Sequence, residues 1–220
     1  MATQLREASF AEMRAAMVDC QLRTNDVIDP AVVAAMGQVP RERFVPADMA
    51  ALAYIDRPVP LGGGRRLNPP LVTARLLVAA EVAAGHNVLL IGAATGYAAA
   101  LLARLGAVVT AVESDAALAQ LADTELGGQN VTLVTGPLAD GAPANAPYDC
   151  IFIDGAVEHV PASLTAQLAE GGVLVCALRD GPVTQLARGI KVAGAVSLRP
   201  FADMDAAALP GFAQPRPFTF

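Results

Sequence analysis

The sequence predicts an α/β fold in which helices cover both faces of a doubly wound, mostly parallel, seven-stranded type of sheet. From residue 71 onward, short apolar runs alternate with segments of helical periodicity. The runs, such as NVLLI at 87–91, are apolar over nearly their whole length, which is typical of strands buried on both faces of a parallel sheet. The chain has 220 residues, of which 54% are hydrophobic and 16% charged, so it can bury a large core and is not disordered.

The first 70 residues follow a different pattern, and we expect a helical and loop extension there. The S-x-x-E pattern at 9–12 is a capping box that begins a helix. The Asp-Pro pair at 29–30 begins a second helix, which has to end before the next proline. Residues 57–70 contain too many Pro and Gly for a packed element, so we expect a functional or mobile loop.

Helices and strands alternate through the rest of the chain. We expect helices at 71–84, 96–105, 115–126 and 161–169, and strands at 87–91, 107–112, 131–134, 150–153 and 173–178. Two further strands, at 183–192 and 195–202 around an Ala-Gly turn, would add an antiparallel hairpin to one edge of the sheet. We therefore expect a single domain over 1–220, with an N-terminal extension (1–70), a parallel core (71–178) and a C-terminal hairpin and tail (179–220).

Charge and hydropathy disfavour two classes of partner. The formal net charge of −6 argues against nucleic-acid binding through a basic face. The longest apolar stretch, 71–84, is interrupted by Arg75 and Glu81, so no membrane span is expected.

Cysteine usage and the N-terminus bear on the compartment. Cys20, Cys150 and Cys176 lie far apart and form no C-x-x-C pair, which fits a reducing compartment and argues against a thiolate metal site. The N-terminus lacks the apolar region of a secretory signal. We expect a cytoplasmic protein without a metal, and a monomer is plausible.

A ligand site is expected where the first parallel strand ends. Gly92 permits a tight turn after that strand, and Gly96 lets the next helix begin close to it. Glu113 ends the following strand. Its spacing in sequence from Gly92 is that at which an acidic side chain accepts hydrogen bonds from ribose hydroxyls. The alternative is turn chemistry without a ligand. The loop lacks the full dinucleotide fingerprint and the P-loop, so S-adenosylmethionine, which has no phosphates, is favoured over NAD and ATP.

Several phrases of the sequence together resemble one family. Residues 17–62 contain MV..QL, AM..VPRE.FVP and AY.DR.VPLG, and the likeness continues through NVLLIGAATGYAAALLARL, NVTLVTG, APYDCIFI and LTAQLAEGGVLV to residue 178. This pattern is similar to that of the protein-L-isoaspartate O-methyltransferases. The resemblance implies a Rossmann-like class I methyltransferase fold, S-adenosylmethionine as the methyl donor, and an isoaspartyl carboxylate of a damaged protein or peptide as the acceptor.

The resemblance also implies which residues face the acceptor. Arg66 and Asn68 stand where the family usually has the Thr and Ser of its Thr-Ile-Ser-x-Pro phrase. Asp154, which follows the strand at 150–153, would face the methyl-transfer site; the alternative is a turn or helix-capping Asp. The acceptor carboxylate is already ionised at neutral pH, so the reaction needs positioning rather than a strong base.

The implied cofactor-binding residues lie on three loops: Gly92, Ala93, Ala94, Gly96, Glu113, Pro137 and Leu138. Three positions depart from the family pattern. Leu90 lacks the usual acidic group, Ala94 adds a methyl in the glycine-rich loop, and Pro137 removes a carboxylate and a backbone N–H. These departures leave two alternatives open: a catalytically impaired member that acts as a binding or scaffolding module, and a methyltransferase with a different carboxylate or small-molecule acceptor.

Three further sets of residues have two interpretations each. Arg65 and Arg66 together could bind an acidic peptide or form a solvated pair. Tyr97 could line the cofactor cleft or pack at a helix start. Glu158 and His159 are expected to be solvated surface groups rather than a catalytic pair.

Overall fold

The main sheet contains the strands that the apolar runs predict, and the computed structural model describes residues 9–214. In chain order the strands are β3 (Asn87–Ile91), β4 (Val108–Glu113), β5 (Val131–Thr135), β6 (Tyr148–Val157), β7 (Leu168–Asp180), β8 (Val183–Val192), β9 (Ala195–Val196) and β10 (Arg199–Asp203). The structure does not describe residues 1–8, on which part of the prediction of no secretory signal falls. It also does not describe residues 215–220, which belong to the expected C-terminal tail.

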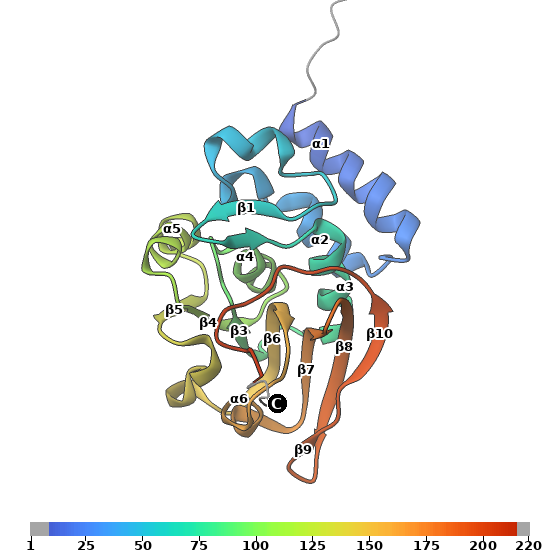
Figure 1. Ribbon diagram of the computed structural model, residues 1–220. Coiled ribbons are helices and arrows are strands. Elements are labelled where there is room, and N and C mark those ends of the chain that lie inside the picture. The colour runs from blue at the N-terminus through green and yellow to red at the C-terminus, as the bar shows by residue number, and fades with distance from the viewer. Residues whose placement is uncertain (1–8, 215–220) are drawn as a thin grey trace, which may run out of the picture.

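The strand order defines a doubly wound sheet. The order is β10-β8-β7-β6-β3-β4-β5, with β9 paired to β8 (Figure 1). Strands β3, β4, β5, β6 and β7 pair with one another in parallel, whereas β8 is antiparallel to both β7 and β10. The expected parallel core and antiparallel C-terminal hairpin are both confirmed. The chain runs outward from β3 to β5 and then returns to β6, so β3 and β6 flank the switch point where ligands bind in such sheets.

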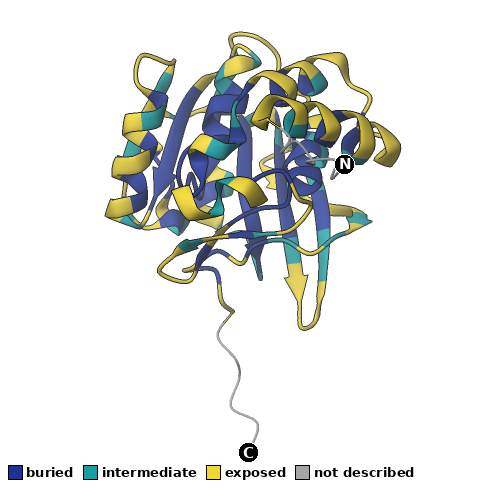
Figure 2. Ribbon diagram, turned by 90° about the horizontal axis from the view of Figure 1, so that it is seen from above, coloured by how far each residue is buried: buried dark blue, intermediate teal, exposed yellow. Residues whose placement is uncertain are grey.

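Helices cover the sheet on both faces. They are α3 (Pro70–Ala80), α4 (Tyr97–Arg104), α5 (Ala116–Leu126) and α6 (Ala162–Gln167), with 3-10 turns η5 (Leu138–Asp140) and η6 (Pro143–Asn145). Alternate residues of β3 enter opposite clusters: Val88 packs with residues of α3 and α4, and Leu89 with Leu164 of α6. Figure 2 shows the strands buried between helices whose outer faces are exposed. The two core clusters therefore lie on opposite faces of β3.

The N-terminal extension folds as short helices. They are α1 (Phe10–Met17), the π-helical turn η1 (Val18–Leu22), η2 (Arg23–Asn25), α2 (Pro30–Gln38), η3 (Arg41–Phe44) and η4 (Ala47–Leu52). Both predicted helix starts are confirmed. The Ser9 hydroxyl accepts from the Glu12 N–H and the Glu12 carboxylate accepts from the Ser9 N–H, which completes the capping box. The Asp29 carboxylate caps α2.

The expected loop at 57–70 contains a β-hairpin, so that expectation is wrong in part. Strands β1 (Val59–Gly62) and β2 (Arg65–Leu67) pair antiparallel and form a separate two-stranded sheet (Figure 1). Val59 and Leu67 lie opposite each other and are both buried in the core, which holds the base of the hairpin. The glycines therefore form its turn rather than prevent an element.

The largest differences between the predicted and observed bounds concern two helices and two strands. Helix α3 ends at Ala80 rather than 84, because Glu81 adopts a left-handed conformation with φ 51°. Strands β6 and β7 extend well beyond their apolar runs, since each has neighbours on both sides. Helix α6 accordingly stops at Gln167, where β7 begins.

After β10 the chain returns across the sheet. This stretch, residues 204–214, is called the C-terminal segment below. The Ala156 N–H donates to the Ala207 carbonyl at 2.7 Å, and the Leu209 N–H donates to the Ala156 carbonyl at 2.9 Å. In Figure 1 it is the red strand-free segment that leads from β10 towards β6. None of the helices within residues 9–214 combines the length and the apolar character that crossing a bilayer requires.

Candidate active site

The turn after β3 brings the backbone close to the end of β4. The N–H groups of Gly92 and Ala93 both donate to the Val112 carbonyl, at 3.0 and 3.1 Å. Gly92 has φ 81° and Ala94 has φ 50°, so the turn requires left-handed conformations at both positions. Ala93 and Ala94 are buried. The departure at Ala94 is thus accommodated in a conformation that favours glycine.

The turn also fixes where α4 begins. Gly96 has φ 98°, and a Cβ there would lie 2.9 Å from Leu126 Cδ1 of α5. Tyr97 then starts the helix fully buried, with its ring centroid 5.6 Å from that of Phe44 and 4.7 Å from the Arg41 guanidinium carbon. Of the two readings of Tyr97, the structure supports packing at the helix start.

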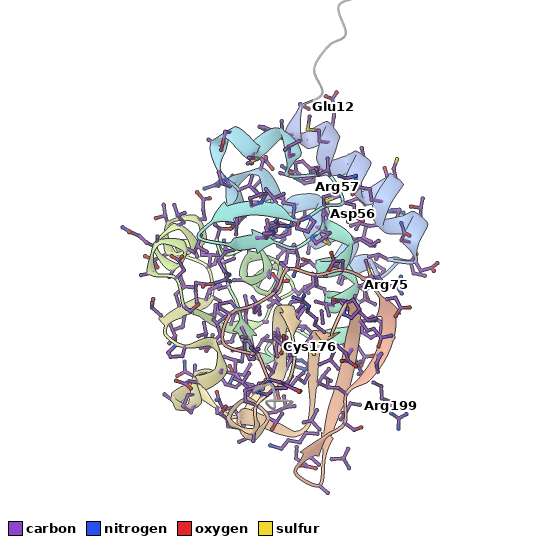
Figure 3. The ribbon with its side chains drawn as sticks, viewed as in Figure 1. Glu12, Asp56, Arg57, Arg75, Cys176 and Arg199 are labelled. Carbon is purple, nitrogen blue, oxygen red and sulfur yellow. The ribbon has the colours of Figure 1, made fainter. Side chains whose placement is uncertain are left out.

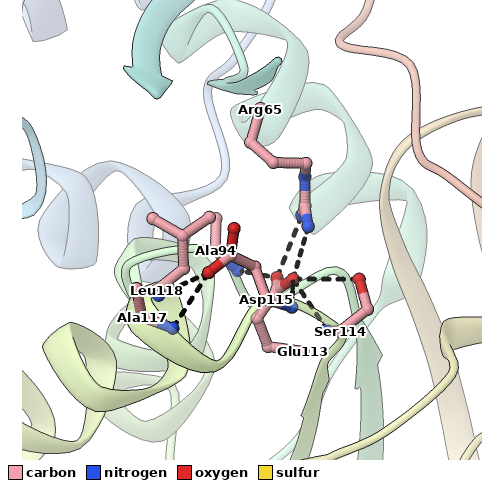
Figure 4. A network of polar contacts seen from close by, with 7 residues as sticks. All are labelled: Arg65, Ala94, Glu113, Ser114, Asp115, Ala117 and Leu118. Atoms are coloured by element: carbon pink, nitrogen blue, oxygen red, sulfur yellow. Dashed lines mark hydrogen bonds and ion pairs between the residues drawn. The ribbon is translucent and has the colours of Figure 1, made fainter. Parts of the chain in front are cut away.

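Glu113 lies at the end of β4 and is fully buried beside this turn. Three backbone N–H groups donate to its carboxylate: those of Ala94 at 2.7 Å, Ser114 at 2.8 Å and Asp115 at 2.9 Å. Figure 4 shows these contacts converging on the two oxygens. The acid is therefore held in a defined orientation at the predicted ribose position, but it is not free.

Arg65 occupies the remaining side of that carboxylate. Its two terminal nitrogens pair with the two Glu113 oxygens in a bidentate ion pair, with Nη2 2.9 Å from Oε2. The Arg65 side chain is only 7% exposed. The reading of Arg65 as part of a solvated pair is therefore wrong, because a buried acid faces it. Arg66, the next residue, is exposed on the outer side of the hairpin.

Asn68 and Asp154 meet on the other side of the switch point. The Asn68 Nδ2 donates to Asp154 Oδ1 at 2.8 Å, and both side chains are buried. Burial raises the pKa of Asp154, while the Asn68 amide and the Arg41 and Arg65 cations act in the opposite direction. Asp154 lies inside β6, because that strand runs on to Val157. The reading of Asp154 as a turn or helix cap is wrong.

The third cofactor loop follows β5. The Gly136 N–H donates to the Glu113 carbonyl at 3.0 Å, so this loop begins beside the acid. Pro137 is exposed, and Leu138 is buried where η5 begins. The structure therefore brings the three expected loops together at one edge of the sheet.

The C-terminal segment covers this edge of the sheet. The Ala207 N–H donates to Asn68 Oδ1 at 2.8 Å, so both ends of the Asn68 amide are engaged. Leu209 fills the space in front of the turn, since a Cβ on Gly92 would lie 2.8 Å from Leu209 Cδ2. The segment is anchored further along by Glu158, whose carboxylate accepts from the Gln214 N–H at 2.7 Å.

Sequence reasoning missed three parts of this arrangement. Arg65 was not paired with an acid, although the short strand pattern at 65–67 places alternate residues on opposite faces. Arg41 was not identified; it is fully buried and donates to the carbonyls of Ala53 at 2.6 Å and Asn68 at 2.5 Å. The place of Leu209 had no signal in the sequence. His159, expected to be solvated, has Nδ1 3.1 Å from the Phe212 carbonyl and so contacts the C-terminal segment.

The side chains and backbone groups at this site fit a nucleoside better than a metal ion. An oriented carboxylate beside a glycine turn, at the switch point of a doubly wound sheet, can accept two ribose hydroxyls once its partner cation withdraws. Within the described part of the chain, no three His, Cys, Asp or Glu side chains are placed to hold a metal ion. The sheet order and the place of this site at the switch point are those of the class I methyltransferase fold.

Comparison with known proteins identifies the family. The family model for protein-L-isoaspartate(D-aspartate) O-methyltransferases matches residues 13–200, so the chain belongs to that family. A protein-L-isoaspartate O-methyltransferase of Rhodopseudomonas palustris is 45% identical over 170 residues, which cover 76% of this chain and 69% of that protein. One of Methylorubrum populi is 44% identical over 164 residues, covering 74% and 77%. The function and the methyl donor that the sequence resemblance implies are thereby confirmed at the level of the family.

Solved structures agree on the fold. A protein-L-isoaspartate O-methyltransferase superposes with a TM-score of 0.78 at 24% identity, covering 90% of this chain and 66% of that chain. A putative family member from Plasmodium falciparum, solved in complex with S-adenosyl-L-homocysteine, gives 0.75 at 19% identity, covering 89% and 97%. At these identities the likeness confirms the class I methyltransferase fold and nothing finer.

Proposed function

We propose that this chain transfers a methyl group from S-adenosylmethionine to the isoaspartyl carboxylate of a damaged protein or peptide, with Arg66, Asn68 and Asp154 on the acceptor side. One observation supports placing the methyl donor beside Glu113 and the acceptor beside Asn68 and Asp154. Glu113 lies at the end of β4 and the Asn68–Asp154 pair lies at β6, so the two groups flank the carboxyl end of β3. A donor and an acceptor held at these two places would meet over that strand.

The donor side would be formed by the three loops described above. Bound S-adenosylmethionine supplies a methyl group on a positively charged sulfur, which a carboxylate can attack. The Glu113 carboxylate would accept the ribose hydroxyls, and the turn that contains Gly92 and Gly96 would approach the ligand with its backbone. Ala93, Ala94, Pro137 and Leu138 would complete the walls of the site.

The acceptor side has to position an anion and exclude water. The acceptor carboxylate is ionised at neutral pH, so no general base is required and alignment supplies most of the acceleration. Burial raises the pKa of Asp154, which lessens the repulsion between this group and an incoming carboxylate. Arg66, exposed at the hairpin, is placed to pair with a charge of the incoming peptide.

A paired-peptide assay tests the proposed reaction. The protein is incubated with methyl-labelled S-adenosylmethionine and a short peptide that contains one isoaspartyl residue, or with the same peptide containing ordinary aspartate. We expect a base-labile methyl ester on the isoaspartyl peptide alone. Equal labelling of both peptides, or labelling of neither in a protein that binds the donor, contradicts the proposed acceptor.

A second assay tests the donor side. Replacing Glu113 with Ala removes the proposed ribose acceptor, so calorimetric titration should show S-adenosylmethionine binding weakened by at least tenfold, or about 1.4 kcal/mol. Circular dichroism at the titration temperature checks that the variant is folded. Unchanged affinity in a folded variant would show that Glu113 is not the ribose ligand.

A second candidate function is a non-catalytic binding module. The observation that favours it is the filled crevice: Arg65 lies on Glu113 and Leu209 lies against Gly92. Titration with S-adenosylmethionine and S-adenosylhomocysteine separates the two functions. Micromolar binding supports the enzyme, whereas no heat and no thermal shift up to millimolar ligand supports the module.

The remaining proposals concern the compartment, the oligomeric state, the partners and the extent of the domain. We place the protein in the cytoplasm as a monomer whose partner is the isoaspartyl substrate, without nucleic acid and without a membrane. The free thiols Cys20, Cys150 and Cys176 are compatible with a reducing compartment. We treat residues 1–220 as one catalytic domain, because the site draws on the N-terminal hairpin, the core and the C-terminal segment together.

A further inference from the structure

The Glu113 carboxylate has no acceptor capacity left. Its Oε1 receives the N–H groups of Ser114 and Asp115 together with Arg65 Nη1, and its Oε2 receives the Ala94 N–H and Arg65 Nη2. The Ser114 hydroxyl also donates to Oε1, at 3.3 Å, so six contacts fill the roughly four lone-pair positions that an ionised carboxylate offers. A ribose therefore cannot bind beside Arg65 at this acid; it has to replace Arg65.

We infer that Arg65 is an internal competitor for the donor's ribose, and that binding of the donor requires the Arg65 guanidinium to leave Glu113. This inference rests on the proposed function and adds a residue that sets donor affinity. The exchange is chemically matched, because two N–H donors of the guanidinium give way to two O–H donors of a ribose diol. The three backbone N–H groups stay in place, so Glu113 keeps its orientation and its charge when Arg65 leaves.

The element that carries Arg65 is suited to this movement. The β1–β2 hairpin is a two-stranded sheet with no hydrogen-bonded strand of the main sheet beside it. Isolated two-stranded hairpins are only marginally stable. Gly62 ends β1 and Gly63 and Gly64 form the turn, all three with positive φ; a Cβ on Gly62 or Gly64 would meet nothing within 4 Å, and one on Gly63 would lie 3.4 Å from Asp115 Oδ2. Arg65 follows this turn directly, whereas the buried residues Val59 and Leu67 hold the other end.

The competition predicts that removing Arg65 strengthens donor binding. S-adenosylhomocysteine is titrated into the parent protein, Arg65→Ala and a matched control, Arg57→Ala. Arg57 is exposed just before the hairpin (Figure 3), so the control makes the same change in net charge without touching Glu113. We expect Arg65→Ala to bind at least tenfold tighter than the parent and Arg57→Ala to bind within twofold of it. Equal or weaker binding by Arg65→Ala overturns the inference.

Two further measurements keep the test decisive. If Arg65→Ala does not fold, Arg65→Met keeps the apolar stem without the charge and should give the same gain. In the parent protein, saturating S-adenosylhomocysteine should speed amide hydrogen exchange at the hairpin turn while it slows exchange at residues 92–96; slower exchange at both contradicts the release of Arg65. Tight binding by Arg65→Ala without methylation of an isoaspartyl peptide leaves the inference standing and refutes the proposed acceptor. Absence of binding by the parent and both Arg65 variants refutes the inference.

Discussion

The two halves of the Arg65–Glu113 ion pair should differ in what they contribute to stability. In Glu113→Ala, the Arg65 charge stays buried at 7% exposure without this ion-pair partner, and the N–H groups of Ala94, Ser114 and Asp115 lose their acceptor. Breaking a buried pair in this way costs about 3–5 kcal/mol. In Arg65→Ala the Glu113 carboxylate keeps those three donors, so the loss is that of charged hydrogen bonds, about 1–3 kcal/mol.

Urea unfolding followed by circular dichroism measures both effects. The double variant removes both charges, so it should be more stable than Glu113→Ala although it carries one more substitution. The reference is Arg57→Ala, an exposed substitution, which should lie within about 0.5 kcal/mol of the parent. The reasoning is refuted if the two single variants lose equal stability, or if the losses of the single variants simply add in the double variant.

Three further outcomes follow from other parts of the structure. Gly96→Ala should lower the free energy of unfolding by about 1–3 kcal/mol, because the new Cβ meets Leu126 and φ is 98°; a neutral effect in urea unfolding would contradict this. Asp154→Asn should raise the melting temperature at neutral pH. Burial raises the pKa of Asp154, so above about pH 4 the folded state binds more protons than the unfolded state, and this acid lowers the stability of the fold as the pH rises; Asn removes that loss. That gain should vanish below about pH 4, and a gain that persists there would show another cause. At pH 8 a thiol reagent should label the exposed Cys20 rapidly and leave Cys176 unlabelled, because burial inside the sheet raises the pKa of Cys176 to about 12 (Figure 3); equal labelling rates would contradict this burial.

The sequence predicted the core well because local pattern and burial agree there. The bounds of β3 were predicted correctly, since four consecutive apolar residues follow Asn87 and the run lies between two turn signals. The strand at 183–192 was also placed correctly, bounded by turns on both sides. The capping box at 9–12 and the Asp-Pro start at 29–30 were confirmed because capping depends on residues within one helical turn.

The hairpin was missed because its stability does not come from its own residues. Prolines and glycines outnumber strand formers in 57–70, which predicts a loop. The strands form because Val59 and Leu67 enter a core built largely from helices elsewhere in the chain. Propensity within a short window contains no information about that core.

The candidate site shows the same division. Glu113 was found because its place at the end of the second parallel strand follows from spacing. Its partner was not, because Arg65 lies 48 positions earlier and reaches the acid only through the hairpin. Asp154 was expected just after a strand and lies inside β6; its partner Asn68 is 86 positions away, and the contact of Asn68 with Ala207 spans 139 positions. Such pairings are set by tertiary structure.

The position of Leu209 against Gly92 has a consequence for how the protein is made. Translation proceeds from the N-terminus, and Leu209 follows every strand of the main sheet along the chain. Leu209 is therefore synthesised after all the strands beside it, and the space in front of Gly92 can be filled only once the C-terminal segment has been made.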